Sequence, residues 1–185
     1  ILHIEASTSV CSVALSQDGH VFFERVNHEE MSHAKVLAPF VEEALQIVNL
    51  FVDRDQMIVE TKGKTARSNN VYKTRNNPRY KDLPLIVLVD KNSASASEIV
   101  SGALQDLGRA KLIGQRTFGK GLVQNVRSVA HGGHIKVTTS KYYLPSGRCI
   151  QAIDYSERQK GHELKRDTAG GILPDIVIND SAKVD

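Results

Sequence analysis

Residues 89–124 read VDKNSASASEIVSGALQDLGRAKLIGQRTFGKGLVQ, and this stretch decides the fold class. A continuous apolar run at residues 83–90 leads into it and predicts a strand covered on both faces. Apolar residues then recur at helical spacing over residues 96–107, and Gly108 ends that pattern. Another apolar run at residues 110–114 predicts the next strand. A strand, a helix and a strand in this order are typical of an α/β fold.

The flanking sequence adds further β segments and a second helix. Alternating apolar and polar residues over residues 1–25, with a tight turn at Asp18-Gly19, predict a β-meander. A helix is expected after Ser32, because apolar residues follow at helical spacing as far as Phe51. Pro39 marks its first turn or a kink. Further strands are predicted at residues 122–129, 134–144, 149–153 and 171–178, and an irregular segment at residues 154–170.

A basic segment separates the second helix from the α/β pattern. Residues 61–82 are polar and rich in Asn, and no acid occurs between Lys62 and Lys81. This composition predicts a mobile surface loop. The alternative is a nucleic-acid contact, since tyrosines interleave with the basic side chains of Lys73, Arg75 and Arg79. We favour the solvated loop, because charge runs are usually solvent-exposed.

The overall composition sets the broad limits on function. The chain has 185 residues, of which 41% are hydrophobic and 24% charged, as expected for one globular domain or one domain with an appendage. A net charge of +3 does not by itself imply a polyanionic partner. No apolar run approaches the roughly 20 residues that cross a bilayer. Two cysteines, Cys11 and Cys149, are too few for a disulfide framework or a zinc site.

Ser95 opens the predicted helix of residues 96–107 and has two interpretations. Ser95 and Glu98 have the spacing of a capping box, and the local pattern alone favours this structural role. The alternative is a nucleophile, because the unpaired amides of a helix N-terminus can stabilise an oxyanion. The backbone N–H of Ala96 is then the nearest donor. Ala94 and Ala96 are small enough to let a peptide carbonyl approach.

A serine nucleophile needs a base, and Lys120 is the candidate. Lys120 follows the second strand of the strand–helix–strand unit, and both strand ends of such a unit reach the same sheet edge. A lysine amine accepts a proton only when uncharged, and an apolar setting favours that form. Phe118, Leu122 and Val123 are expected to provide this setting. The alternative is a solvated lysine in a flexible glycine turn.

A phosphate-binding loop is a competing interpretation of the same turn. Residues 114–120, GQRTFGK, have the spacing of such a loop and follow a strand. The position after the lysine must then be Ser or Thr, yet it is Gly121. The loop should also open a helix, whereas residues 122–129 have a strand pattern. We therefore favour the lysine turn over a nucleotide site here.

Taken together, these motifs closely resemble the catalytic stretch of the carboxyl-terminal processing peptidases, also called tail-specific proteases. The likeness extends through residues 136–155 and 170–178, and back to residues 46–52 and 56–64, so that it covers about three quarters of the chain. It implies a partial core over residues 46–180 that is similar in fold to ClpP and crotonase. The implied activity is serine endopeptidase, with protein or peptide substrates and no cofactor or metal.

The resemblance also assigns roles to single residues. The central serine of the SASASE motif, the nucleophile of the family, is Ser95, and the FGKG lysine, its base, is Lys120. The family glutamine that orients this lysine falls on Gln124, and an acid that matters in some members falls on Asp106. For Asp106 we favour a solvated acid at the helix end.

Two family features are not found in the sequence. The resemblance implies a strand that ends in an Arg-Asn-Gly-Gly type motif and supplies a second oxyanion donor, and nothing similar precedes Gln46. A peptide-binding PDZ domain is likewise not found. We therefore expect weak or no activity. Family members are usually exported, whereas the N-terminal stretch lacks a signal-peptide pattern, so the location stays open.

Residues 1–45 resemble a different family. They are similar to the start of the TsaB-type proteins, which have an actin-like fold and support threonylcarbamoyladenosine modification of tRNA. The apolar positions of residues 42–51 keep helical phase across the junction. This predicts a fusion of a partial actin-like segment, residues 1–45, with a partial peptidase core, residues 46–180, and a tail at residues 181–185. The alternative function is then a non-catalytic interaction module.

Overall fold

The computed structural model describes residues 2–5, 11–17, 20–27, 37–153 and 169–178. A six-stranded sheet with the strand order β10-β7-β6-β1-β2-β3 forms one layer. Its strands are β1 (Leu2–Glu5), β2 (Cys11–Gln17), β3 (His20–Asn27), β6 (Ile86–Val89), β7 (Lys111–Gly114) and β10 (Ile176–Val177). The predicted N-terminal meander is confirmed, because β1, β2 and β3 pair antiparallel. The meander joins the sheet through parallel pairing of β1 with β6.

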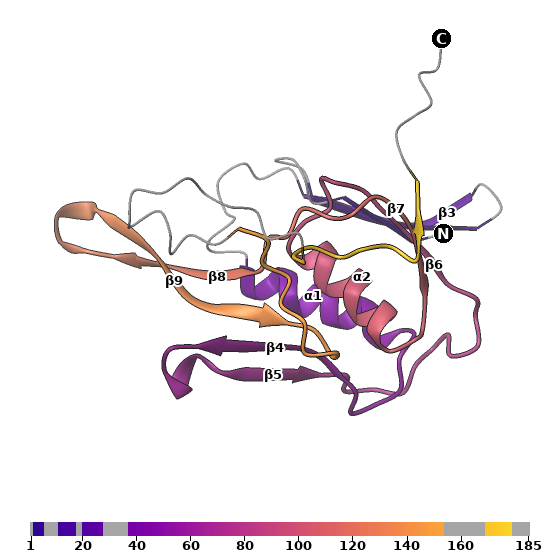
Figure 1. Ribbon diagram of the computed structural model, residues 1–185, viewed down its shortest axis with the longest axis horizontal. Helices are drawn as coiled ribbons and strands as arrows, with labels where there is room; N and C mark the ends of the chain where they lie inside the picture. Colours follow the sequence, from indigo (N-terminus) through magenta and orange to yellow (C-terminus); the bar gives the residue numbers. More distant parts are fainter. Residues whose placement is uncertain (1, 6–10, 18–19, 28–36, 154–168, 179–185) are drawn as a thin grey trace, which may run out of the picture.

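Two helices lie between this sheet and a second one (Figure 1). They are α1 (Leu37–Asn49), with Pro39 in its first turn, and α2 (Ala96–Asp106). Their apolar faces pack together, and α2 also contacts β4 and β7. The core consists of buried side chains from both helices and both sheets: Val48, Phe51, Ile58, Ile99, Leu104, Leu112, Leu144, Ile150 and Ile172. In the described part of the chain no helix has the length and apolar character needed to cross a membrane.

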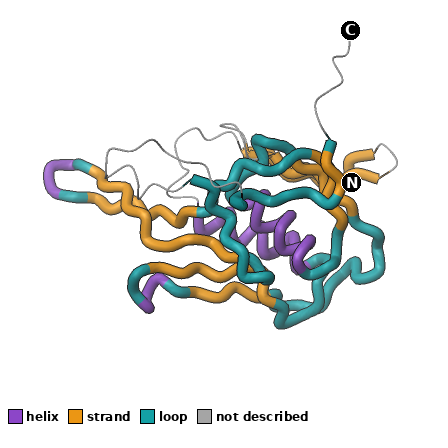
Figure 2. The backbone as a smooth tube through the Cα atoms, in the orientation of Figure 1, coloured by secondary structure: helices purple, strands orange, loops and turns teal. Residues whose placement is uncertain are grey.

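The second sheet has the order β5-β4-β9-β8 and is antiparallel throughout. It contains β4 (Met57–Gly63), β5 (Asn70–Lys73), β8 (Leu122–Ser128) and β9 (His134–Tyr143). Short 3₁₀ turns, η1 (Ala66–Ser68) and η2 (Ala130–Gly132), close the two hairpins. Figure 2 shows both hairpins extending away from the helices on the same side of the molecule.

The prediction of a loop over residues 61–82 was wrong for its first half. β4 runs to Gly63 and pairs with β5, so these residues form a hairpin. Thr61 is 4% exposed, and its hydroxyl donates to Ser68 O at 3.0 Å and accepts Asn70 N–H at 3.1 Å. The polar composition of this segment did not indicate strands. The buried position at the end of β4 is a threonine with satisfied hydrogen bonds rather than an apolar residue.

The structure corrects two other strand predictions. β6 was predicted to be covered on both faces, yet Ile86 is 48% and Leu88 46% exposed, while Val87 and Val89 are buried against the helices. The helices therefore cover only one face of this strand. The predicted strand at residues 149–153 is reduced to isolated bridge positions at Cys149, which pairs with Tyr143, and at Ile153. The predicted helix cap Ser32 and the irregular residues 154–168 lie outside the described residues.

Candidate active site

Ser95 stands at the turn between β6 and α2, at the helix N-terminus as predicted. Its backbone has φ 56° and ψ −113°, a conformation that strains a non-glycine residue by about 1–3 kcal/mol. A strained strand-to-helix turn of this kind can hold a serine hydroxyl clear of the backbone. Ala94 and Ala96 flank it, so no large side chain adjoins Ser95 in sequence.

Ala96 is the first residue of α2, and its N–H has no acceptor within its own helix. An unpaired amide next to a nucleophile is what an oxyanion donor requires. Its position is therefore consistent with the role expected from the sequence.

Glu98 lies beneath this turn and is fully buried. Its Oε2 accepts the Ser95 N–H at 2.9 Å and the Lys120 N–H at 2.8 Å. Its Oε1 accepts the Thr117 hydroxyl at 2.5 Å and the Gly119 N–H at 2.7 Å. Burial raises the pKa of the Glu98 carboxyl above its usual range, although the four donors oppose this shift. One carboxyl group therefore joins the start of α2 to the turn around Lys120.

The turn at residues 114–121 is fixed on its other side as well. Thr117 is fully buried, and its hydroxyl also accepts the Ile172 N–H at 2.7 Å. Its backbone N–H donates to Ile172 O, and the Phe118 N–H donates to Ser93 O at 2.9 Å. These bonds connect three distant parts of the sequence, residues 93–98, 117–120 and 171–172, into one rigid unit.

Lys120 comes close to Ser95 through its backbone, but its side chain is not placed as predicted. The two backbone N–H groups share one carboxylate oxygen, so their nitrogens lie within two hydrogen-bond lengths of each other. The Lys120 side chain is exposed, and Phe118, predicted to cover it, is 43% exposed. Within the described residues its amine has no hydrogen-bond partner. The predicted apolar setting is therefore not formed around the amine, although Leu122 and Val123, the other two residues expected to provide it, are half-buried.

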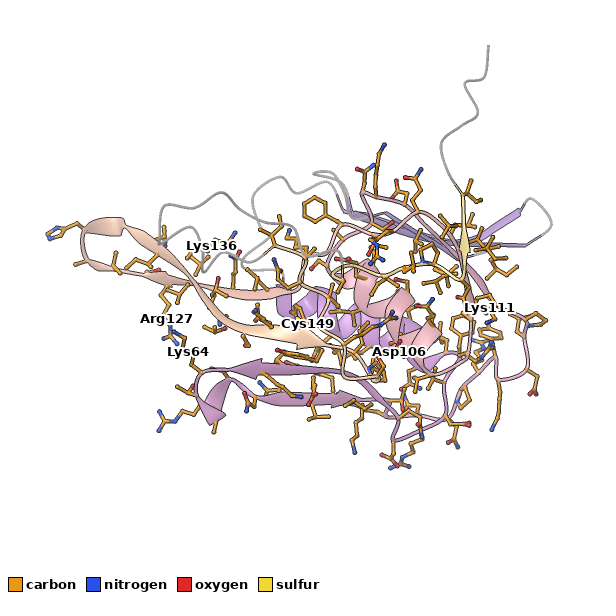
Figure 3. All side chains as sticks on the ribbon, viewed as in Figure 1. Lys64, Asp106, Lys111, Arg127, Lys136 and Cys149 are labelled. Atoms are coloured by element: carbon orange, nitrogen blue, oxygen red, sulfur yellow. The ribbon has the colours of Figure 1, made fainter. Side chains whose placement is uncertain are left out.

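Gln124 and Asp106 have partners other than Lys120. Gln124 lies on β8, and its side-chain amide donates to the Thr138 hydroxyl at 3.4 Å. Asp106 is at the far end of α2 (Figure 3) and pairs with Arg148 at 2.8 Å, while its other oxygen accepts the Ser146 N–H at 3.0 Å. Its side chain is 7% exposed, so our expectation of a solvated acid was wrong. This helix is about 16 Å long, which separates Asp106 from Ser95.

Gly119 gives a direct test of this geometry. Its φ is +86°, and an added Cβ would lie 2.2 Å from Ala152 Cβ. We expect Gly119→Ala to lower the free energy of unfolding by about 3 kcal/mol or more, because it adds a clash to the backbone strain. Urea unfolding followed by circular dichroism measures this.

Gly108→Ala is the matched control for Gly119→Ala. Gly108 has φ +65°, but a Cβ added to it would have no other atom within 4 Å. This substitution should cost about 1 kcal/mol, from backbone strain alone. If both variants lose the same free energy of unfolding, the turn at Gly119 is not tightly packed.

No group of three or more His, Cys, Asp or Glu that could hold a metal ion occurs among the described residues. The arrangement around Ser95 thus consists of a serine hydroxyl, backbone amides, a lysine and a buried carboxyl group. These groups are suited to nucleophilic acyl transfer.

Comparison with known families matches residues 40–178 to the family described as Peptidase family S41. A carboxy-terminal-processing protease of Bartonella bacilliformis is 36% identical over 138 residues, which are 75% of this chain and 28% of that protein. The solved photosystem II D1 C-terminal processing protease is 29% identical with a TM-score of 0.60, over 75% of this chain and 31% of that one. This chain therefore spans less than a third of either relative.

Mature CPAF has a similar fold over 94% of this chain and 50% of its own, with a TM-score of 0.53 and 12% identity. At that identity the likeness concerns the fold alone. The family match begins at residue 40. The resemblance of residues 1–45 to a TsaB-type protein, and the fusion that it implies, therefore stay predictions.

Proposed function

The chain belongs to peptidase family S41. From this membership we propose that residues 46–180 form the core of a serine endopeptidase, with Ser95 as nucleophile and Lys120 as base. The observation that carries the proposal is the shared Glu98 oxygen, which tethers the backbones of both residues. A helix cap alone needs only the bond between the Ser95 N–H and Glu98. The additional bond from the Lys120 N–H brings the turn before β8 to the same carboxylate oxygen. The Ser95 and Glu98 pair also forms a capping box at the start of α2, so the hydroxyl that caps the helix is the one proposed to react.

In the proposed reaction, Ser95 Oγ attacks the carbonyl carbon of a peptide bond and its proton passes to the Lys120 amine. The carbonyl oxygen becomes an oxyanion and accepts a hydrogen bond from the Ala96 N–H. When the intermediate collapses, the amine product leaves with the proton from Lys120. The acyl group stays on Ser95 until water, deprotonated by the same lysine, releases it.

Lys120 must reorient to take part in this reaction. Its four-carbon chain is exposed and flexible, whereas its backbone is fixed by Glu98. A peptide bound across Ser95 would displace water from this turn and add apolar surface beside Phe118. We propose that bound substrate in this way supplies the apolar setting that the free chain lacks. The proposed substrates are polypeptides, cut near their carboxyl ends as the names of the relatives suggest.

A fluorophosphonate probe tests the proposed function. Such a probe reacts with an activated serine and needs no turnover, which matters because only one oxyanion donor is assigned and the loss of one donor slows reaction about 10²–10³-fold. We expect one covalent adduct, located on Ser95 by mass spectrometry of the peptides. Labelling spread evenly over Ser93, Ser95 and Ser97, or no labelling at all, would refute an activated nucleophile.

A further inference from the structure

A hollow lies on the surface between α1 and the segment that follows β5. Its volume is about 480 Å³. Its lining combines basic side chains, amides and an apolar floor: Glu42, Leu45, Gln46, Asn49, Leu50, Lys73, Arg75, Asn76, Asn77 and Arg79. We call this hollow the α1 pocket.

The wall of the α1 pocket is fixed mainly by hydrogen bonds between the Asn49 side chain and the backbone of residues 75–76. Asn49 Oδ1 accepts the N–H groups of Arg75 and Asn76 at 2.8 and 3.0 Å, and Asn49 Nδ2 donates to Asn76 O at 2.8 Å. The Tyr80 N–H donates to Leu50 O at 2.8 Å. The segment at residues 75–80 is therefore fixed on the last turn of α1, and the pocket exists before any ligand binds.

Three cations of the α1 pocket have no counter-ion among the described residues. Lys73, Arg75 and Arg79 are exposed, and in the described part of the chain none of them forms an ion pair. The guanidinium of Arg79 lies 5.5 Å from the centroid of the Tyr80 ring, which leaves its N–H groups available. Glu42 is the one acid of the lining, so the local charge stays positive.

The pocket is separate from Ser95. Arg109 follows the C-terminus of α2, and its guanidinium donates to the carbonyl oxygens of Phe51 and Tyr80, next to the pocket. Ser95 caps the opposite end of this helix, about 16 Å away. A ligand in the α1 pocket would not occupy the proposed catalytic site.

We propose that the α1 pocket binds an acidic protein segment that carries apolar side chains. Lys73, Arg75 and Arg79 would pair with its carboxylates, and the floor of Leu45 and Leu50 would take its apolar side chains. A nucleic-acid strand fits less well, because it needs an extended basic track rather than a confined hollow. The inference goes beyond the proposed protease function and does not depend on it.

The test is fluorescence anisotropy with a fluorescein-labelled peptide of alternating glutamate and leucine. The full chain with Ser95→Ala serves as the background, so that no peptide is cleaved. We expect the triple variant Lys73→Gln, Arg75→Gln and Arg79→Gln to weaken binding about tenfold or more, since three ion pairs are lost. A peptide with serine in place of leucine should also bind more weakly, and added NaCl should reduce the affinity.

A second triple variant is the matched control. Lys64→Gln, Arg67→Gln and Arg127→Gln remove the same charge from exposed positions of the two hairpins. Lys64 and Arg127 are labelled in Figure 3. These changes should alter the affinity less than about threefold, because their charges are screened from the pocket. If both triple variants lose the same affinity for the peptide, net charge alone explains the binding and the proposal is wrong. Tighter binding of a single-stranded oligonucleotide, abolished by the pocket triple, would overturn it in favour of nucleic acid.

Discussion

Replacing Lys120 by alanine is expected to lower the rate of peptide hydrolysis about 10²–10⁴-fold, the range that general-base catalysis contributes. The backbone N–H of Lys120 bonds to Glu98, and alanine keeps that bond, so the turn should stay in place. The loss then reports on the amine alone. Cleavage of an unfolded protein substrate, followed with the Ser95→Ala variant in parallel, measures it.

Ser95→Ala should abolish the same activity, and the double variant should be no slower than Ser95→Ala alone. Residues that act as one unit give non-additive losses, because removal of either disables the same step. Lys136→Ala is the matched control, since Lys136 is an exposed lysine on β9 (Figure 3). Multiplicative losses in the double variant, or a Lys120→Ala enzyme that keeps its rate, would show that another group takes the proton.

The local pattern around Ser95 predicted its place in the fold correctly. Apolar runs and a glycine stop were enough to position it between β6 and α2. The capping-box interpretation and the nucleophile interpretation are also compatible, since Glu98 accepts the Ser95 N–H while the backbone of Ser95 is strained. A sequence pattern does not reveal a positive φ at a non-glycine residue, because such strain is imposed by surrounding tertiary contacts.

The environment of Lys120 could not be predicted in the same way. Phe118 was expected to bury it, but hydrophobic character alone does not say on which side of a turn a side chain falls. Asp106 was misjudged for a related reason. Its partner Arg148 is 42 positions away, and no local period links the two. The capping-box spacing predicted that Glu98 accepts the Ser95 N–H, but the three further donors, Thr117, Gly119 and Lys120, were missed because they are 19 to 22 positions away.

Replacing Glu98 by alanine is expected to lower the free energy of unfolding by about 3–5 kcal/mol at neutral pH. The change opens a cavity and leaves buried donors of Thr117 and Gly119 without an acceptor, each of which costs about 1–3 kcal/mol. Because Ser95 and Lys120 lose their common tether, kcat should fall more than KM changes. Urea unfolding and steady-state kinetics below the unfolding midpoint measure the two effects.

The control is Glu60→Ala on β4, where the carboxylate pairs with the exposed Lys62. A surface pair of this kind contributes at most about 1 kcal/mol. If Glu98→Ala unfolds no more easily than Glu60→Ala, the Glu98 carboxyl does not hold the two segments together.

The pH dependence of the stability difference between wild type and Glu98→Ala is a second measurement. The pKa of Glu98 is raised in the folded chain, so the folded state holds its proton at pH values where the unfolded state has lost it. The stability contributed by Glu98 is therefore fully present below about pH 4.5 and decreases as the pH rises through the folded pKa. Asp175 has the opposite effect on stability, because hydrogen bonds from the Leu112 N–H and Lys111 lower its pKa to about 2. Wild type and Glu98→Ala both contain Asp175, so its effect cancels when their free energies of unfolding are compared. The difference in the free energy of unfolding between wild type and Glu98→Ala should accordingly become smaller as the pH rises from 4 towards 7. A gap that widens over this range would mean that the four donors outweigh burial and that the carboxylate is the form that the fold prefers.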